Sequence, residues 1–446
     1  MSYDRAEYRR KQISAEAAAA LVESGQWLDY GFGLGQPDRI DAALAARRGA
    51  LHGVRIRACL SMRPRAVVEE DPEGESFLFL NWHFSGYDRR LHDRNRCAYI
   101  PFNFGEAPDL YRRFLRDEVD LALLKVAPID SHGWFNFSAA VTYHRAICDV
   151  ARRIVLEVDP ALPVVHGTEN AVHLSEVAGI VDEGGSGALP ELANPADGEV
   201  DRQVAAHVAS LVEDGACLQI GIGGMPNAVC SLLARSSLRD LGVHTEMMVD
   251  GVVDLFESGR VTGAHKVVDR GKIAYTFAAG SQRLYDFLDG NVGCAAHPVD
   301  YTNLPDRIAR NDRVFSINNT TQIDLQGQCC SESAGFRHLT GTGGQLQFVR
   351  GATMSRGGRS VICLASTFER GGQRSSRIVT ALTPGNVVTT PRTDVMYVVT
   401  EYGVACLKGR SVPERARALI DIAHPEFREP LEREARERNL LPKGFL

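Results

Sequence analysis

The sequence predicts an α/β fold with buried, mainly parallel strands, and three observations lead to that prediction. Short apolar runs alternate with amphipathic stretches along most of the chain, which is typical of helices that cover a parallel sheet. A chain of 446 residues is longer than one hydrophobic core usually organises, so two domains are expected. With 44% hydrophobic and 24% charged residues, the composition is that of an ordinary globular protein.

The apolar runs that predict strands are residues 121–126, 153–158, 217–222, 360–365 and 395–400. Valines at helical spacing from Val204 to Val212 predict a helix that ends near Gly215 and leads into the third of these strands. Residues 413–438, rich in Arg, Glu, Ala and Leu, predict solvated helices. Residues 184–201 combine Gly, Pro, Asn and acidic residues with little apolar periodicity, so they form the predicted linker. We therefore expect domains of residues 1–190 and 191–446.

Charge and hydropathy argue against several classes of partner. The formal net charge of -6 disfavours nucleic acid as a partner. No run approaches the roughly 18 apolar residues that a membrane helix needs, and residues 1–12 are charged rather than signal-like. A cytoplasmic protein without a membrane partner is expected. Ten cysteines are scattered, and the one close pair, Cys329 and Cys330, lacks the spacing of zinc ligands, so no metal site is expected.

A glycine-rich turn follows the predicted strand 217–222 and reads Gly221-Ile222-Gly223-Gly224-Met225-Pro226-Asn227. Glycine permits a tight turn, and a helix that starts near Pro226 would direct free N–H groups toward a phosphate. Glycine also occurs in such turns for steric reasons alone, so the motif by itself is compatible with either role. The dinucleotide fingerprint Gly-x-Gly-x-x-Gly is not matched.

Glu246 lies at the end of an apolar segment that reads Val243-His244-Thr245-Glu246-Met247. The carboxyl end of a parallel strand faces the crevice where open α/β sheets bind ligands, so Glu246 could act as an acid, a base or a nucleophile. A surface or helix-capping carboxylate is the alternative. The neighbouring His244 is interpreted as structural.

A second glycine-dense turn, Thr340-Gly341-Thr342-Gly343-Gly344-Gln345, could direct backbone N–H groups at one oxygen, as an oxyanion hole does. A flexible loop is the alternative, although the amide and charged side chains that follow favour a functional turn. In the N-terminal half, the Gly and aromatic clusters at residues 30–37 and 82–87 could line a substrate pocket. The second cluster is interpreted as part of the core.

Taken together, these segments resemble the acetyl-CoA hydrolase/transferase family of class I CoA-transferases, in its branch of 4-hydroxybutyrate and butyryl-CoA:acetate CoA-transferases. The resemblance covers most of the chain. It rests on segments that occur in the family order: residues 127–133, the GIGGMPNAV run, the HTEM segment, residues 316–318, the GTGGQ turn, residues 399–403 and residues 422–427. Agreement in order across this many segments is not expected by chance.

The resemblance implies two similar open α/β domains with the active site between them, a homodimer, and Glu246 as the catalytic residue of the C-terminal domain. It implies that Gly343 and Gly344 supply backbone donors at the thioester. It further implies that Glu401 lies near the reacting centre and that coenzyme A (CoA) is bound by Gly223, Gly224, Met225, Pro226, Asn227, Asn318, Gly344 and Gln345.

The implied reaction moves CoA from a short-chain acyl-CoA to a free carboxylate with ping-pong kinetics, through acyl-glutamyl anhydride and glutamyl-CoA thioester intermediates on Glu246. CoA is then a substrate, and no resident cofactor or metal is required. The alternatives are an acyl-CoA hydrolase of the same family and, more remotely, a non-catalytic CoA-binding protein. A dinucleotide-dependent oxidoreductase is disfavoured because the fingerprint is missing.

The chain departs from the family pattern at two positions. Family members commonly carry an acidic residue where this chain has Gln347, in G-G-Q-x-D-F, and where it has Gln322 after the S-I-N segment. The loss of two negative charges leaves the acyl donor and the acceptor open. Butyrate-like, 4-hydroxybutyrate-like and short dicarboxylate acceptors such as itaconate are all compatible with the sequence.

Overall fold

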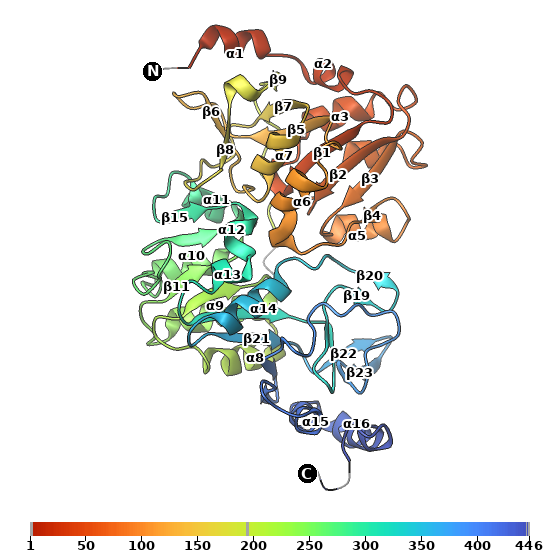
Figure 1. Ribbon diagram of the computed structural model, residues 1–446, viewed down its shortest axis with the longest axis vertical. Coiled ribbons are helices and arrows are strands. Elements are labelled where there is room, and N and C mark those ends of the chain that lie inside the picture. Colours follow the sequence, from red (N-terminus) through yellow and green to blue (C-terminus); the bar gives the residue numbers. More distant parts are fainter. Residues whose placement is uncertain (1–2, 193–195, 443, 445–446) are drawn as a thin grey trace. The chain divides into compact units, whose positions relative to one another are not determined.

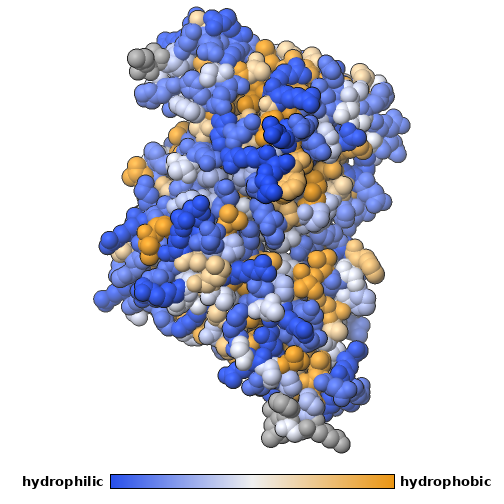
Figure 2. All heavy atoms as spheres, viewed as in Figure 1, coloured by the Kyte–Doolittle hydropathy of each residue, from blue (hydrophilic) through white to orange (hydrophobic). Residues whose placement is uncertain are grey.

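The computed structural model describes residues 3–192, 196–442 and 444, which form two compact units (Figure 1). The first unit contains the described residues up to 192 together with residues 274–302, and the second contains the other described residues. Within the described part of the chain, no helix is both long and apolar enough to cross a membrane. Hydrophilic residues predominate on the face drawn in Figure 2, and hydrophobic ones occur there in small groups.

The first unit is built on a parallel sheet with the strand order β4-β3-β2-β1-β5-β7-β9. The strands are β1 (Trp27–Phe32), β2 (Val54–Cys59), β3 (Phe77–Asn81), β4 (Ala98–Tyr99), β5 (Leu121–Val126), β7 (Arg153–Val158) and β9 (Gly179–Val181). After β1 the chain adds β2, β3 and β4 outward on one side of it, and then β5, β7 and β9 on the other. The strand order therefore reverses between β1 and β5, which is where open α/β sheets place ligands.

The core of the first unit forms where helices cover this sheet. The helices α2 (Ala15–Ala20) and α3 (Arg39–Ala45) place small and branched apolar residues against β1, β2 and β5. Leu121 and Leu123 point to the same side of β5 because strand side chains alternate, and both are fully buried. Each buried leucine contributes about 1.5–3 kcal/mol, so this packing fixes the strand ends that carry the polar residues described below.

The second unit contributes the strand order β11-β10-β16-β21-β25-β26, parallel except for the last pair. The strands are β10 (Cys217–Ile220), β11 (Gly242–His244), β16 (Val314–Asn319), β21 (Arg359–Cys363), β25 (Tyr397–Thr400) and β26 (Gly403–Cys406). Connecting helices include α8 (Glu199–Ala209), α9 (Gly224–Arg235) and α14 (Gln345–Met354). Because the first five strands are parallel, their carboxyl ends lie along one edge.

The predicted α/β class with mainly parallel sheets is confirmed. Strands β5 and β7 have the predicted bounds, whereas the strand predicted over 217–222 ends at Ile220 because the glycine-rich turn begins there. The solvated helices expected near the C-terminus are α15 (Val412–Asp421) and α16 (Pro425–Glu437). The predicted linker 184–201 was wrong at its end, because α8 already begins at Glu199.

Candidate active site

Glu246 lies where the chain leaves β11 at the carboxyl edge of the second sheet. Only Thr245 and Glu246 separate β11 from the short strand β12 (Met247–Met248). The Thr245 hydroxyl donates to the Met247 carbonyl at 3.1 Å, which tightens this break between the strands. The Glu246 side chain is partly buried there. Its backbone position is therefore fixed by strands and by a local hydrogen bond.

Two neutral donors hold the Glu246 carboxylate. Asn303 Nδ2, at the end of α12 (Val299–Asn303), donates to Glu246 Oε2 at 2.6 Å, and Asn303 is 0% exposed. The backbone N–H of Gly344, the residue that precedes α14, also donates to this carboxylate. A Cβ on Gly344 would lie 2.2 Å from Glu246 Oε2 and 2.3 Å from Asn303 Nδ2. Glycine is therefore required at position 344 for the three groups to meet.

Burial raises the pKa of Glu246 to about 7, while the hydrogen bonds from Asn303 and Gly344 act to lower it. Burial has the larger effect on the pKa, because the loss of hydration destabilises the carboxylate more than the two neutral donors stabilise it. Near neutral pH the side chain is thus divided between acid and carboxylate. A poorly hydrated carboxylate in a fixed position is a better nucleophile than one in water.

The glycine-rich turn leads from β10 into α9. Gly223 precedes the helix with φ +128°, a conformation that favours glycine, and α9 begins at Gly224 rather than near Pro226. Within the described residues no side chain caps this helix start, so its first N–H groups suit an anion. Asp201 of α8 approaches the same turn, because a Cβ on Gly224 would lie 2.9 Å from its Oδ2. Met225 and Pro226 are buried and support the turn.

The other predicted site residues of this unit lie at or next to the same sheet edge. Asn318 on β16 pairs with Gln219 on β10, since Asn318 Nδ2 donates to Gln219 Oε1 at 3.0 Å. Glu401 follows β25 and accepts hydrogen bonds from the backbone and hydroxyl of Ser366 at 2.9 and 2.5 Å. Gln345 opens α14, and its Nε2 donates to the Thr390 hydroxyl at 3.2 Å.

Gly343 adopts φ +56°, and the turn it belongs to is held from outside by Glu332. The Thr342 hydroxyl donates to Glu332 Oε2 at 3.0 Å, and the backbone N–H of Leu339 donates to the Glu332 carbonyl at 2.7 Å. The left-handed conformation at Gly343 turns the chain so that the N–H of Gly344 reaches Glu246. The turn is therefore an ordered part of the site.

The two departures from the family pattern have different surroundings. Gln322 on β17 (Gln322–Asp324) donates from Nε2 to the Thr383 hydroxyl at 3.0 Å, and its Oε1 accepts from Asn386 Nδ2 at 2.7 Å. A carboxylate at this position could accept from Asn386 but could not donate to the Thr383 hydroxyl, so the amide suits the contact with residues 383–386. Gln347 is buried on α14.

The 82–87 cluster and two glycines of the 30–37 cluster have structural roles in the first unit. Trp82 and Phe84 are buried, which agrees with the core interpretation. Gly31 and Gly35 lie against the buried His144, where a Cβ would come within 2.1 and 2.4 Å of its ring. Nε2 of His144 accepts the Phe32 N–H at 2.9 Å, and burial lowers the pKa of His144 to about 3, so it stays neutral.

Sequence reasoning missed Asn303, Gln219 and Ser366. Asn303 lies far along the chain from Glu246, in no glycine turn and in no recognisable motif, so its contact depends on tertiary packing. Gln219 could have been found, because it stands in the predicted strand directly before the glycine-rich turn. Ser366 follows β21 at the same sheet edge, which is the general position where polar residues reach ligands.

Comparisons with known proteins agree on one family. The acetyl-CoA hydrolase/transferase N-terminal domain matches residues 1–186, and the C-terminal domain of the same name matches residues 280–435. The butyryl-CoA:acetate CoA-transferase of Anaerostipes caccae is 43% identical over 97% of this chain and 98% of its own. The 4-hydroxybutyrate coenzyme A transferase of Clostridium kluyveri is 38% identical over 97% and 98%. The crystal structure of RipA from Yersinia pestis superposes with a TM-score of 0.89 at 37% identity, covering 98% and 99% of the two chains.

Proposed function

Because the chain belongs to the acetyl-CoA hydrolase/transferase family, we propose that it transfers CoA from a short-chain acyl-CoA to a free carboxylate, with Glu246 as the nucleophile. One observation carries the proposal: Glu246 is a partly buried carboxylate held by two neutral donors, the Asn303 amide at Oε2 and the backbone N–H of Gly344. The relatives named as CoA-transferases span nearly the whole chain and support transfer over hydrolysis.

In the first half of the reaction, Glu246 Oε1 attacks the acyl-CoA carbonyl, because Oε2 is the oxygen that accepts from Asn303. The C–S bond breaks, an acyl-glutamyl anhydride forms, and CoA leaves as a thiolate. The thiolate then attacks the glutamyl carbonyl carbon, which releases the first carboxylic acid as its anion and leaves a glutamyl-CoA thioester. Atoms and charge balance without ATP or a metal ion.

During attack on the glutamyl carbonyl, negative charge develops on the former Oε2. Asn303 Nδ2 already donates to that atom and the Gly344 N–H donates to the same carboxylate, so both would stabilise the tetrahedral intermediate without reorganising. Gly343 contributes by setting the turn. The acceptor carboxylate then repeats the steps in reverse: it attacks the thioester, and the expelled thiolate takes the new acyl group and regenerates Glu246.

CoA binding in this proposal uses the start of α9 and the neighbouring strand ends. Backbone N–H groups at the helix start suit a phosphate of CoA. The proposed contacts are Gly223, Gly224, Met225, Pro226, Asn227, Asn318, Gly344 and Gln345, while Glu401 acts indirectly through Ser366. We further propose a homodimer, a cytoplasmic location and two catalytic domains, 1–190 and 191–446, with residues 274–302 of the second packing within the first unit.

The test is to incubate the purified protein with several short acyl-CoAs, with and without a panel of carboxylates, and to follow every CoA species by mass spectrometry. We expect new acyl-CoAs that form only when an acceptor is present. Free CoA that accumulates regardless of acceptor would identify a hydrolase instead. Binding without any turnover would contradict both and leave a CoA-binding protein.

A further inference from the structure

The reversal point of the first sheet carries a small cavity. Its walls come from the segments after β1 and β2 and from β5 itself, with Leu34 and Met62 on the apolar side and Arg63 and Lys125 on the charged side. Pro190 completes the lining. Its interior has room for about one water molecule. A position that favours ligand binding in open α/β sheets is therefore narrowed to a cavity that admits nothing larger than about one water molecule.

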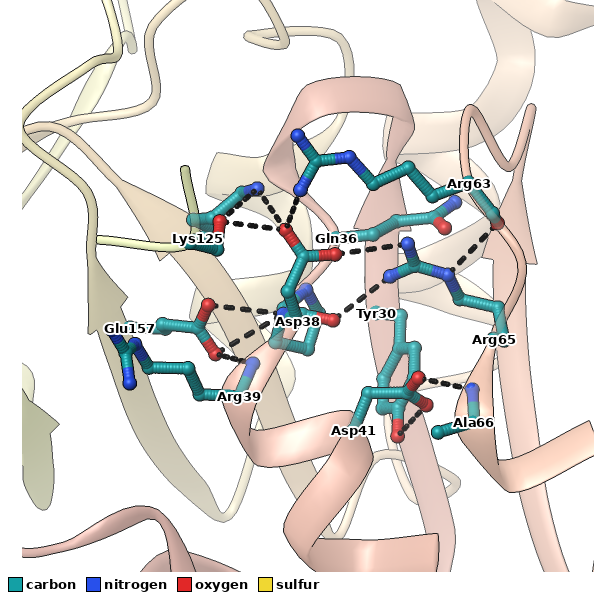
Figure 3. Close-up of polar contacts among 12 residues, drawn as sticks. Tyr30, Gln36, Asp38, Arg39, Asp41, Arg63, Arg65, Ala66, Lys125 and Glu157 are labelled. Atoms are coloured by element: carbon teal, nitrogen blue, oxygen red, sulfur yellow. Dashed lines mark hydrogen bonds and ion pairs between the residues drawn. The ribbon is translucent and has the colours of Figure 1, made fainter. Parts of the chain in front are cut away.

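Asp38 is the centre of the charged side (Figure 3). Its Oδ2 accepts from Lys125 Nζ at 2.7 Å and from Arg63 Nη1 at 2.8 Å, and its Oδ1 accepts from Arg65 Nη2 at 2.9 Å. Lys125 and Arg65 are only 2% and 3% exposed. Burial acts to raise the pKa of Asp38, but these cations outweigh it and hold that pKa well below its usual range. Asp38 is thus a permanent anion.

Residues 183–190, which we name the strap, are fastened to this cluster. The Ser186 hydroxyl contacts Asp38 Oδ2 at 2.8 Å and Asp159 Oδ2 at 2.9 Å. Arg39 Nε donates to the Gly185 carbonyl at 2.9 Å, and Arg63 donates to the Ala188 carbonyl. The strap thus touches residues of the charged wall and also supplies Pro190 to the lining.

The contacts that hold the strap can break without separating the buried ion pairs of Asp38. The strap contacts the cluster through the Ser186 hydroxyl, through backbone carbonyls and through an exposed ion pair between Glu183 and Arg39 at 3.7 Å. Such an exposed pair contributes little, so lifting the strap leaves Asp38 paired with Lys125, Arg63 and Arg65. Separating those ion pairs would instead leave a buried charge uncompensated, which is far more costly than losing neutral hydrogen bonds. The cluster therefore stays assembled whether the strap is down or up.

Two further features fit a strap that closes over a ligand cavity. Gly184, Gly185 and Gly187 have φ of +81°, +79° and +92°, so the closed strap is a folded conformation that few other residues would adopt. Gln36, 2% exposed, lines the cavity, and its Nε2 is fixed by the Cys59 carbonyl at 2.8 Å. Its Oε1 is buried without a hydrogen-bond partner among the described residues, so it can accept from a bound molecule.

We propose that the strap is a latched gate over the cavity of the first unit, with the Ser186 contacts to Asp38 and Asp159 as the latch. In the closed state nothing larger than about one water fits, so a small ligand can enter only when the strap lifts. This inference does not depend on the chemistry proposed for Glu246.

Hydrogen exchange followed by mass spectrometry tests the latch in the full-length protein. In Ser186→Ala, the peptide that covers residues 183–190 should exchange about tenfold faster than in the unmodified protein, because both carboxylate contacts of the hydroxyl are lost. Ser24→Ala is the matched control, since it removes one hydroxyl contact elsewhere in the same unit, to the His52 N–H at 3.0 Å. Equal exchange in the two variants would overturn the latch.

A second pair of variants tests the folded conformation of the strap. Gly185→Ala should also open it, because the new Cβ would lie 2.7 Å from Asp159 Oδ1 at φ +79°. Gly49→Ala bears the same backbone cost at φ +80° with nothing within 4 Å, so it controls for strain alone. Fast exchange of residues 183–190 in Gly185→Ala and not in Gly49→Ala supports the proposal. The same exchange in both contradicts it.

Labelling of a cavity residue tests the gating itself. In a Leu34→Cys background, iodoacetamide should alkylate the thiol at position 34 about tenfold faster when Ser186→Ala is added. The rate should not change when Ser24→Ala is added instead. Leu34 is 2% exposed and lines the cavity, so the reagent must enter there. Identical labelling rates in the two double variants would show that the strap does not control access.

Discussion

Asp38 in the first unit and Glu246 in the second are carboxylates held near strand ends, yet their surroundings give them opposite properties. Asp38 accepts from a lysine and two arginines, which hold its pKa well below the usual range. Glu246 accepts from a side-chain amide and a backbone N–H, and burial raises its pKa to about 7. Burial acts in the same direction on both groups, so the charge of the neighbours decides the outcome.

This difference separates a structural carboxylate from a reactive one. Three cations leave Asp38 little electron density to donate, and they make its protonation costly. Neutral donors position Glu246 without neutralising its charge, and Asn303 donates to Oε2 of the carboxylate. A carboxylate that must attack a thioester needs the second arrangement.

The largest effect is expected for removal of the reactive carboxylate. Glu246→Gln should lower the transfer rate by at least about 1,000-fold, because the amide cannot form the anhydride. The fold should persist, since the side chain lies at a break between strands rather than in the core. Mass spectrometry measures acyl-CoA formation, and thermal unfolding of the same variant checks that the fold persists. Exchange at near the original rate would remove Glu246 from the mechanism.

A smaller loss is expected when one neutral donor is removed. Asn303→Leu should lower kcat by about 100-fold, as loss of a single oxyanion donor does in other enzymes. The hydrogen bond from Asn303 lowers the pKa of Glu246, so its removal should also move the acid limb of the rate profile to higher pH. The pH profile separates this role from a merely structural one. A slower enzyme with an unmoved acid limb would contradict direct contact with the reacting carboxylate.

Carboxylate-to-amide changes should have opposite effects on stability in the two units. The pKa of folded Glu246, about 7, lies above its usual value of 4.5, so ionisation costs stability as pH rises between these values. Glu246→Gln should therefore stabilise by about 1–3 kcal/mol at pH 8 and have little effect at pH 4. The folded pKa of Asp38 is lowered, so its contribution is present above its unfolded pKa and is lost only at more acid pH.

Asp38→Asn should accordingly destabilise by about 3 kcal/mol at pH 8, because it leaves buried cations without their anion, and most of that loss should persist at pH 4. Unfolding midpoints in urea at the two pH values provide the measurement. Shifts in the same direction for both variants would show that burial, and not the charge of the neighbours, governs these sites.

Strand positions, the class of fold and the segments around Glu246 could be predicted from the sequence because each depends on local pattern. Runs such as 121–126 are continuous and apolar, and their bounds match β5. The contact between Asn303 and Glu246 could not be predicted, because it joins residues 57 apart in sequence. The sequence predicts a linker over most of the strap, because glycine, proline and polar residues indicate a loop but do not show which residues hold it in place. Its partners Asp38 and Asp159 carry no motif.

The last prediction concerns the pH dependence of the reaction. If the Glu246 carboxylate is the nucleophile, kcat/KM should be level above about pH 7 and fall about tenfold per pH unit below it, since its pKa is about 7 and only the ionised form attacks. Asp41 is the necessary control, because burial raises the pKa of Asp41 to about 6, close enough to imitate such a limb.

Asp41 belongs to the charged cluster of the first unit, where it accepts from the Ala66 N–H at 2.6 Å and from the Tyr30 hydroxyl at 3.2 Å. Asp41→Asn removes the titration and keeps one accepting oxygen, which can serve the Ala66 N–H bonded to Oδ2 or the Tyr30 hydroxyl bonded to Oδ1. The acid limb should stay near pH 7 in this variant and move only when Asn303 is changed. A limb that disappears in Asp41→Asn would assign the rate-controlling ionisation to the first unit, and the contrast between a locked and a reactive carboxylate would then fail.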